Sequence, residues 1–179
     1  MDRKVSIVED LEGMKTVFIH DIIFKGRQKI DWDDVEKYME RYVGDFYNID
    51  DSNDVVYIGS DMPDEYAHSQ YTAVLKGTRA KAKANAAQGI PELVKIATEK
   101  TGTKNKKEKH NKDAKYGWYK YASRFALPVY GRALEIVRYN VFDVSLIVRH
   151  DKDERLYLYD IVNIKKEAGT PFQPNDLTR

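Results

Sequence analysis

The sequence of 179 residues contains no cysteine. Disulfide bonds and thiolate metal sites are therefore excluded, which fits a reducing compartment. No apolar run approaches the roughly 20 residues that a membrane-spanning helix needs, and residues 1–6 lack the apolar core of a secretory signal. No Gly-x-x-x-x-Gly-Lys-Ser/Thr run is present, so the glycines form no phosphate-binding loop. We therefore expect a cytoplasmic protein with no membrane partner and no cofactor.

Charge is distributed unevenly along the chain, although the formal net charge is only +1. Residues 31–65 hold twelve acids and two bases, whereas residues 76–120 hold thirteen bases and four acids. These stretches could be solvated faces that neutralise each other, or the basic one could bind phosphates. We divide the chain into an acidic N-terminal unit at residues 1–75 and a helical, basic and sheet-forming unit at residues 76–179. The two could also form one continuous domain.

The acidic unit predicts a strand, a helix and a second strand. Residues 17–24 are rich in β-branched and aromatic side chains, as is typical of a strand. A helix is expected between an N-cap at Asp31 and a stop at Gly44, because apolar side chains recur there at helical spacing. A short strand is expected at residues 55–58. Residues 59–78, which include His68, are expected to be mostly loop.

The second unit predicts helices followed by a sheet. Residues 79–88 form an alanine-rich helical run, and Pro91 suits the first turn of a second helix. Alternation with a period of two then indicates strands at residues 125–129, 142–148 and 156–166, joined by short turns as in an antiparallel meander. The expected fold class is α+β. It has an N-terminal strand-helix-strand unit, and helices packed on a C-terminal antiparallel sheet of about four strands.

The stretch of residues 106–124 mixes cations, aromatic rings and a histidine just before the sheet. Lysines neutralise phosphates and aromatic faces stack on unpaired bases, so the stretch indicates contact with nucleic acid. The alternative is that its lysines form a solvated loop and its rings belong to the core. The expected nucleic-acid-binding side chains are Lys106, Lys107, Lys109, Lys112, Lys115 and Trp118.

The same region offers the groups that metal-independent RNA cleavage requires. Such cleavage needs a base for the 2′-hydroxyl, an acid for the leaving oxygen and cations for the charge on phosphorus. His110 is the expected base and Tyr119 is a candidate acid. Arg124 and Lys165 are candidate phosphate clamps. We expect no metal ion at this site.

Other ionisable residues fit a catalytic role less well. His20 lies within an apolar strand and is expected to be a satisfied structural residue, while His150 could be a second acid-base histidine. Residues 63–64, Pro-Asp, and residues 113–115, Asp-Ala-Lys, formally match a metal-nuclease pattern whose two halves lie on adjacent strands and share a divalent ion. The second half falls in the lysine-rich connector rather than in a strand, which disfavours this hypothesis.

Five blocks of the sequence resemble a family of small domains found in phages and integrative elements of Firmicutes. The resemblance extends over residues 17–171. Domains of this family occur alone or attached to polyvalent proteins and phage head-morphogenesis proteins, which implies a protein of a mobile element. The blocks are Ile-Gly-Ser-Asp-Met-Pro-Asp-Glu-Tyr at 58–66, the run at 80–91 that ends Gln-Gly-Ile-Pro, Lys-His-Asn-Lys-Asp-Ala-Lys-Tyr-Gly-Trp-Tyr at 109–119, Ser-Arg-Phe-Ala-Leu-Pro-Val-Tyr at 123–130 and Leu-Tyr-Leu-Tyr-Asp-Ile at 156–161.

The closing segment at residues 164–171 is similar to phage-borne domains grouped with barnase, EndoU, colicin-type and RelE nucleases. This similarity implies helices on a four-stranded antiparallel sheet and metal-independent RNA cleavage. It places His110, Arg124 and Thr170 at suitable positions for an active site.

Three functions remain open from the sequence. The first is a ribonuclease-like protein that acts on or binds RNA. The second is a non-catalytic interaction protein that inhibits a host defence complex, with the acidic residues 31–65 mimicking nucleic acid. The third is a structural phage module. The expected partner is therefore RNA or a nucleic-acid-handling host protein, and the oligomeric state stays open.

Overall fold

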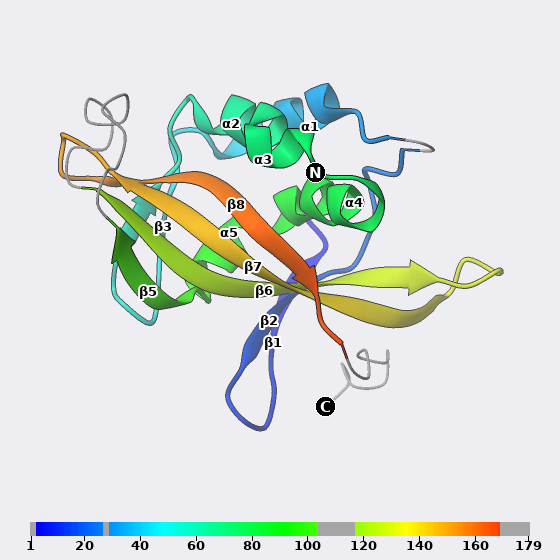
Figure 1. Cartoon of the computed structure of the whole chain (residues 1–179). Helices are drawn as coiled ribbons and strands as arrows, with labels where there is room; N and C mark the ends of the chain where they lie inside the picture. Colours follow the sequence, from blue (N-terminus) through cyan, green and yellow to red (C-terminus); the bar gives the residue numbers. More distant parts are fainter. Residues whose placement is uncertain (1–2, 27–28, 104–116, 169–179) are drawn as a thin grey trace.

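The computed structural model describes residues 3–26, 29–103 and 117–168 (Figure 1). Within these residues the fold is a mixed α+β arrangement of helices packed around one curled sheet. The sheet has eight strands in the described part of the chain, so the expected sheet of about four was too small. No described helix is long and apolar enough to span a membrane.

The strands occur at both ends of the chain and the helices lie mainly between them. The strands are β1 (Val5–Glu9), β2 (Lys15–Ile19), β3 (Phe46–Asn48), β4 (Val55–Tyr57), β5 (Thr98–Thr103), β6 (Trp118–Tyr130), β7 (Ile136–His150) and β8 (Leu156–Lys166). The helices are α1 (Trp32–Met39), α2 (Met62–His68), α3 (Gln70–Ala73), α4 (Gly77–Ala86) and α5 (Ile90–Lys95), with short 3-10 turns η1 (Glu40–Tyr42) and η2 (Ala87–Gly89).

The sheet joins strands from both halves of the chain, in the order β1-β2-β6-β7-β8-β4-β3. The long strands β6, β7 and β8 form the expected antiparallel meander, and β8 covers the range that the sequence pattern indicated. The strands β2 and β4 pair in parallel with β6 and β8, respectively. Since β7 pairs with β6 along nearly its whole length, β2 and β5 share the other edge of β6.

Strand β2 ends at Ile19, well before the expected end at residue 24. The reason is that the following backbone is bound by a helix rather than by a strand. The amides of Ile23 and Phe24 donate to Oδ1 of Asn85 on α4, at 2.9 and 3.1 Å. The backbone amides here therefore bond to a buried side-chain amide instead of to a neighbouring strand. Alternation in the sequence cannot reveal this.

The helical segment begins as expected, because Asp31 caps α1 by accepting from the amides of Asp33 and Asp34. The expectation of a loop at residues 59–78 was wrong, since α2, α3 and the start of α4 lie there. Pro63 sits in the first turn of α2, where a missing N–H costs no helical hydrogen bond. His68 is the last residue of α2 rather than part of a loop.

The main core fills the space between the helices and one face of the sheet, which we call the inner face. Tyr121, Phe125, Val144, Leu146 and Leu158 present this face to the core. The opposite face is called the outer face. In Figure 1 the helices α1, α2 and α3 gather above β8, the β1–β2 hairpin projects downward and the tip of the β6–β7 hairpin extends to the right.

Candidate nucleic-acid interface

Only part of the predicted site falls within the described residues. Trp118 and Tyr119 begin β6, Arg124 lies at its middle and Lys165 is near the end of β8. Thr103 at the end of β5 pairs with Trp118, so the lysine-rich segment leaves and re-enters the sheet at the same end. The remaining predicted residues lie outside the described residues: Lys106, Lys107, Lys109, His110, Lys112, Lys115 and Thr170.

Strand β6 divides the described part of the predicted site between the two faces of the sheet. Side chains alternate along a strand, and no bulge interrupts the pairing of β6 with β7 in this stretch. Tyr119 therefore lies on the inner face, where it packs against the main core, whereas Trp118 and Arg124 lie on the outer face. Lys165 shares the outer face, because Asp143 pairs with both Arg124 and Lys165. The structure thus brings Arg124 and Lys165 together and separates Tyr119 from them.

Carboxylates surround Arg124 and Lys165. Nη2 of Arg124 lies 2.7 Å from Oε2 of Glu167, and Asp143 stands between the two cations in the strand register. Burial and the neighbouring Glu167 raise the pKa of Asp143, against the opposing effect of both cations. A cleft of about 670 Å³ beside Arg124 is lined by six acidic and three basic side chains. This end of the outer face is therefore poorly suited to an anionic ligand.

The other end of the outer face carries a row of residues in direct register across five strands. We call it the aromatic row. The strand neighbours of its first four members pack in or against the main core, so the row itself lies on the outer face. From β6 through β7, β8 and β4 to β3, the row consists of Trp118, Arg149, Tyr157, Tyr57 and Phe46.

Neighbouring members of the aromatic row contact each other from Phe46 to Arg149, and the ring of Trp118 packs against Tyr159 at a centroid distance of 5.0 Å. Ring centroids are 5.6 Å apart for Phe46 and Tyr57, and 5.9 Å apart for Tyr57 and Tyr157. The guanidinium of Arg149 lies 5.1 Å from the ring centroid of Tyr157. Trp118, Tyr57 and Tyr157 are half-buried and Phe46 is 59% exposed, so part of each of these side chains reaches the solvent. Such faces can stack on unpaired bases.

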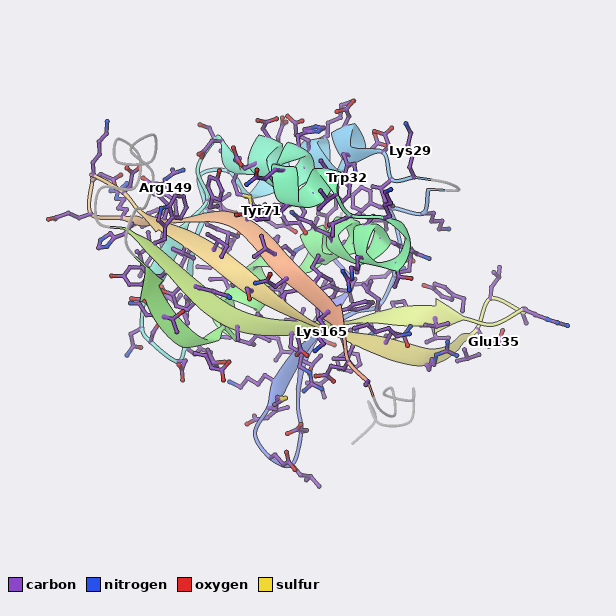
Figure 2. The ribbon with its side chains drawn as sticks, in the orientation of Figure 1. Lys29, Trp32, Tyr71, Glu135, Arg149 and Lys165 are labelled. Carbon is purple, nitrogen blue, oxygen red and sulfur yellow. The ribbon has the colours of Figure 1, made fainter. Side chains whose placement is uncertain are left out.

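Cations lie beside the row as well as in it. Arg155 lies 4.8 Å from the ring centroid of Tyr57, and Lys120 is exposed on the outer face two residues after Trp118. Arg149 is held in place by Asp61, whose Oδ2 lies 2.7 Å from its Nη1. Figure 2 shows Arg149 beside the start of β8 and Lys165 near the end of that strand, so the aromatic row and the acidic cleft are distinct regions of the sheet.

The inner face at the same end holds a histidine next to Tyr119. The rings of Tyr119 and His150 lie 5.7 Å apart, and Nζ of Lys100 is 4.3 Å from the centroid of the Tyr119 ring. Tyr119 is therefore near a histidine and a cation, although not near Arg124. The inner side of this end thus carries the residue types of acid-base chemistry, and the outer side carries those of base stacking.

Comparison of the chain with family models, curated proteins and solved structures gave no match. The resemblance to domains of phages and integrative elements therefore stays a prediction. The function of the protein has to be argued from its own side chains, and the aromatic row is the feature that resembles a known kind of ligand surface most closely in its chemistry.

Sequence reasoning found Trp118 but missed the other four members of the aromatic row. Tyr57 and Tyr157 each stand next to an apolar residue in a predicted strand, which places them on the solvent side of that strand. Their proximity depends on the parallel pairing of β4 with β8, and no local pattern signals this pairing. The metal-nuclease pattern loses its first half, because Asp64 lies on α2 and not on a strand.

Proposed function

We propose that the protein binds single-stranded RNA across the outer face of its sheet. The observation that carries this proposal is the aromatic row, in which four strands contribute aromatic rings and a fifth strand contributes an arginine. Sheets that bind single-stranded RNA use aromatic side chains of this kind to stack on unpaired bases. Arg149 adds a guanidinium plane, which stacks on bases and contacts phosphates.

The position of the row fits the course of a nucleic-acid strand. The described residues that flank the lysine-rich segment, Thr103 and Gly117, lie next to Trp118, so the segment is attached to the sheet at this end. Trp118 and Arg124 are six residues apart on the same face, which corresponds to about 20 Å along β6. Lys120 lies between them, so an RNA strand that stacks on the row would meet this exposed cation next.

Cleavage of the bound RNA is a second step of the same proposal. His110 remains the proposed base and Tyr119 the candidate acid. Because Tyr119 and His150 lie on the inner face, the reacting phosphate would lie at the end of the sheet, beyond the aromatic row, and not over the outer face. No step of this chemistry calls for a metal ion. Arg124 and Lys165 lie at the acidic end of the outer face, which is poorly suited to an anionic ligand, so the proposed reaction does not use them.

The wider setting is proposed on the sequence resemblance alone. We propose that the protein belongs to a phage or an integrative element and acts in the cytoplasm of the host. The resemblance also implies a nuclease-like core in which helices pack on four antiparallel strands. In this protein that core would be the meander of β6, β7 and β8 with one further strand. RNA or a complex that handles RNA would then be the partner.

Binding is tested by fluorescence anisotropy with a short labelled single-stranded RNA. Phe46→Ala and Trp118→Ala each remove one stacking ring, so each should weaken binding by about 1–3 kcal/mol, or roughly five- to hundredfold. Tyr71→Ala is the matched control, because Tyr71 is 48% exposed on α3 and lies outside the row. It should leave the affinity unchanged.

Tryptophan fluorescence gives a second readout of the same site. The chain has two tryptophans, so Trp32→Phe leaves Trp118 as the only one. Stacking of a base on Trp118 should quench the remaining emission as RNA is added. Absence of binding by the intact protein at low salt, or an equal loss of affinity in Tyr71→Ala, would overturn the proposal.

Cleavage is tested separately by incubating the protein with total tRNA in EDTA. His110→Ala should abolish cutting but keep most of the RNA affinity, because phosphate and base contacts lie elsewhere. Intact RNA with both proteins, together with normal binding, would remove the enzymatic step and leave the binding proposal standing.

The acidic N-terminal stretch favours one alternative function. Of its twelve acids in residues 31–65, nine are exposed and three are half-buried, although Asp54 is paired with Lys100 and Asp61 with Arg149 within the fold. This surface fits a mimic of nucleic acid that occupies a basic site on a host defence complex. Pull-down from host lysate would retain a basic protein if this alternative holds, and the RNA titration above would show no binding.

A further inference from the structure

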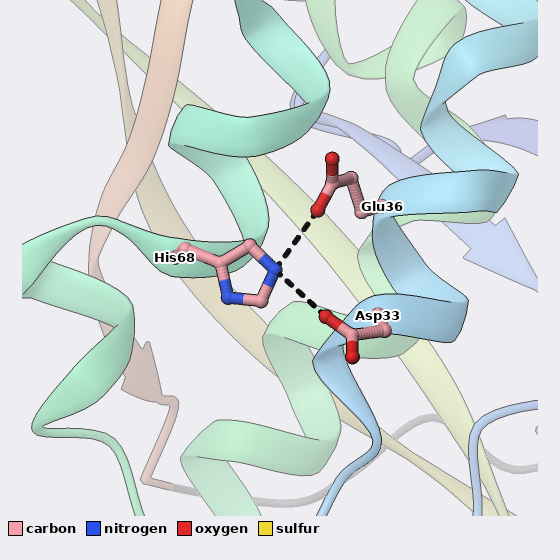
Figure 3. A group of neighbouring side chains, drawn as sticks. All are labelled: Asp33, Glu36 and His68. Carbon is pink, nitrogen blue, oxygen red and sulfur yellow. Dashed lines mark hydrogen bonds and ion pairs between the residues drawn. The ribbon is translucent and has the colours of Figure 1, made fainter.

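Three potential metal-ligand side chains converge where α1 meets the end of α2 (Figure 3). Nε2 of His68 lies 2.9 Å from Oε1 of Glu36 and 3.2 Å from Oδ1 of Asp33. All three ligand atoms lie within 4.8 Å of one another. They belong to two helices that are far apart in the sequence, so the fold and not local spacing brings them together.

Buried neighbours hold Glu36 and His68 in position. Val35, directly before Glu36, is fully buried in the main core. Ala67 and Ser69, on either side of His68, are also buried, and Oγ of Ser69 donates to a carboxylate of β8 at 2.7 Å. The two helix backbones are therefore fixed, so the convergence does not depend on flexible loops.

Hydrogen bonding alone accounts poorly for this arrangement. A neutral imidazole carries one hydrogen, and Nε2 can donate it to only one of the two carboxylates. The carboxylates of Asp33 and Glu36 stand three residues apart on α1, where like charges repel each other. Their side chains are 79% and 33% exposed, and an exposed ion pair with His68 contributes little to stability.

A divalent transition-metal ion would satisfy all three groups at once. Zinc binds histidine nitrogen at about 2.0–2.1 Å and carboxylate oxygen at about 2.0–2.2 Å in a tetrahedron, which sets neighbouring ligands about 3.3 Å apart. The two distances from Nε2 are close to this spacing. One nitrogen with two oxygens suits zinc and its neighbours in the first transition row better than magnesium or calcium.

We propose that Asp33, Glu36 and His68 form a surface site for a divalent ion of the zinc type. Three protein ligands leave the solvent side of the tetrahedron open to water. The bound ion would connect α1 to α2 and replace the repulsion between the two carboxylates by attraction. This site departs from the sequence expectation of no metal ion, and it is independent of the RNA-binding proposal because it lies on the helices and not on the sheet.

The test is calorimetric titration of the whole protein with Zn²⁺. One ion should bind per chain, and His68→Ala, Glu36→Gln and Asp33→Asn should each weaken binding by at least about tenfold, since even an outer partner of a metal ligand contributes that much. Asp34→Asn is the matched control, because Asp34 is an exposed neighbour on the same helix outside the cluster. It should change the affinity less than twofold.

Spectroscopy identifies the ligand atom even if a variant folds poorly. Zinc binding to the intact protein should shift the Nε2 resonance of His68 in nitrogen-edited NMR spectra and leave that of His20 in place. Saturating Zn²⁺ should also raise the thermal unfolding temperature of the wild type but not of His68→Ala. An unshifted His68 resonance, undiminished affinity in His68→Ala, or equal binding of Mg²⁺ would overturn the proposal and leave an acidic surface with an ion pair.

Discussion

At the scale of single residues, the most demanding feature of the molecule is a fully buried ion pair. Nζ of Lys83 lies 2.6 Å from Oδ1 of Asp160, and both side chains are 0% exposed. Lys83 also donates to Oγ1 of Thr72, and Asp160 accepts from Ser69. Burial lowers the pKa of Lys83 and raises that of Asp160, while their mutual attraction and these hydrogen bonds oppose both shifts.

Removing one partner of this pair should be far more costly than removing both. Lys83→Met leaves the Asp160 carboxylate buried without its counter-ion, so we expect a loss of about 3–5 kcal/mol in the free energy of unfolding. The double variant Lys83→Met/Asp160→Leu should recover a large part of that loss. Urea unfolding of the singles and the double measures the coupling. If the double variant instead lost the sum of the two single losses, Lys83 and Asp160 would not be energetically coupled.

His20 provides a pH-dependent contribution to stability. Its Nε2 lies 2.7 Å from Oγ of Ser6 and its Nδ1 lies 2.9 Å from the hydroxyl of Tyr139, so both ring nitrogens have partners, as expected for a structural histidine. Burial lowers the pKa of His20 below its ordinary value. The folded protein therefore favours the neutral ring more strongly than the unfolded chain does.

The sign of this effect follows from proton linkage. The unfolded chain takes up its proton near pH 6.5, and the folded protein takes it up only at lower pH. The contribution of His20 is thus complete above about pH 6.5 and is lost as the pH falls through the folded pKa. Urea unfolding from pH 7.5 to 5 should show a stability difference between wild type and His20→Gln that shrinks with acidification. Parallel curves would show that His20 does not titrate in this way.

At the scale of elements, α1 depends on the cap at its first turn. The helix has only eight residues, and Oδ1 of Asp31 accepts from the amides of Asp33 and Asp34 at 3.1 and 3.3 Å. Short helices gain proportionately more from a cap, because few internal hydrogen bonds stabilise them.

Loss of this cap should destabilise the protein measurably. Asp31→Ala removes the acceptor, so we expect the free energy of unfolding to fall by about 1 kcal/mol. Asp31→Asn keeps an acceptor oxygen at the same place and should cost much less. Chemical unfolding of the three proteins under identical conditions measures both effects. Equal stability of Asp31→Ala and the wild type would mean that packing of Val35 and Met39 alone fixes the helix.

At the scale of the whole molecule, the two halves of the chain share one sheet. Strand β4 lies beside β8 and β2 lies beside β6, so strands before and after residue 75 are neighbours. Helices from the two halves are also in contact. Tyr66 on α2 is buried, and its hydroxyl donates to the backbone carbonyl of Lys83 on α4. Each half therefore completes the core of the other.

Separate expression of residues 1–75 and 76–179 tests this dependence. Neither fragment should show the dispersed NMR spectrum or the cooperative urea unfolding of the full chain, because each lacks strands and helices that cover its apolar side chains. Mixing the two should restore part of the native spectrum. A fragment 76–179 that unfolds cooperatively on its own would show instead that the meander of β6, β7 and β8 is an independent domain.

Local patterns in the sequence were sufficient to predict the helices and strands whose formation depends on local interactions. The cap at Asp31, the alanine-rich helix and the long strands β7 and β8 were predicted because periodicity and capping act within a few residues. Strands β3 and β5 were missed because one has three residues and the other is rich in threonine and glycine next to a lysine run. Residues 59–78 were expected to be mostly loop, although Pro63 suits the first turn of a helix.

The candidate site shows the same division. Trp118 was expected to contact nucleic acid from its neighbours in the sequence, and it does belong to the aromatic row. The sequence could also have predicted that Tyr119 and Arg124 lie on opposite faces, since residues five positions apart on one strand must do so. The other four members, Arg149, Tyr157, Tyr57 and Phe46, were missed because their alignment depends on strand register across the whole sheet.

The sequence by itself determined the fold class, the central meander and the concentration of rings and cations around residue 118, since these follow from composition and from spacing along one segment. Only the tertiary structure decided that β4 lies beside β8, that Arg124 stands among carboxylates and that His68 meets Asp33 and Glu36. The physical reason is that these contacts form only when apolar faces of segments distant in the sequence are buried against each other. Many registers satisfy each segment alone, and only the packed core selects one of them.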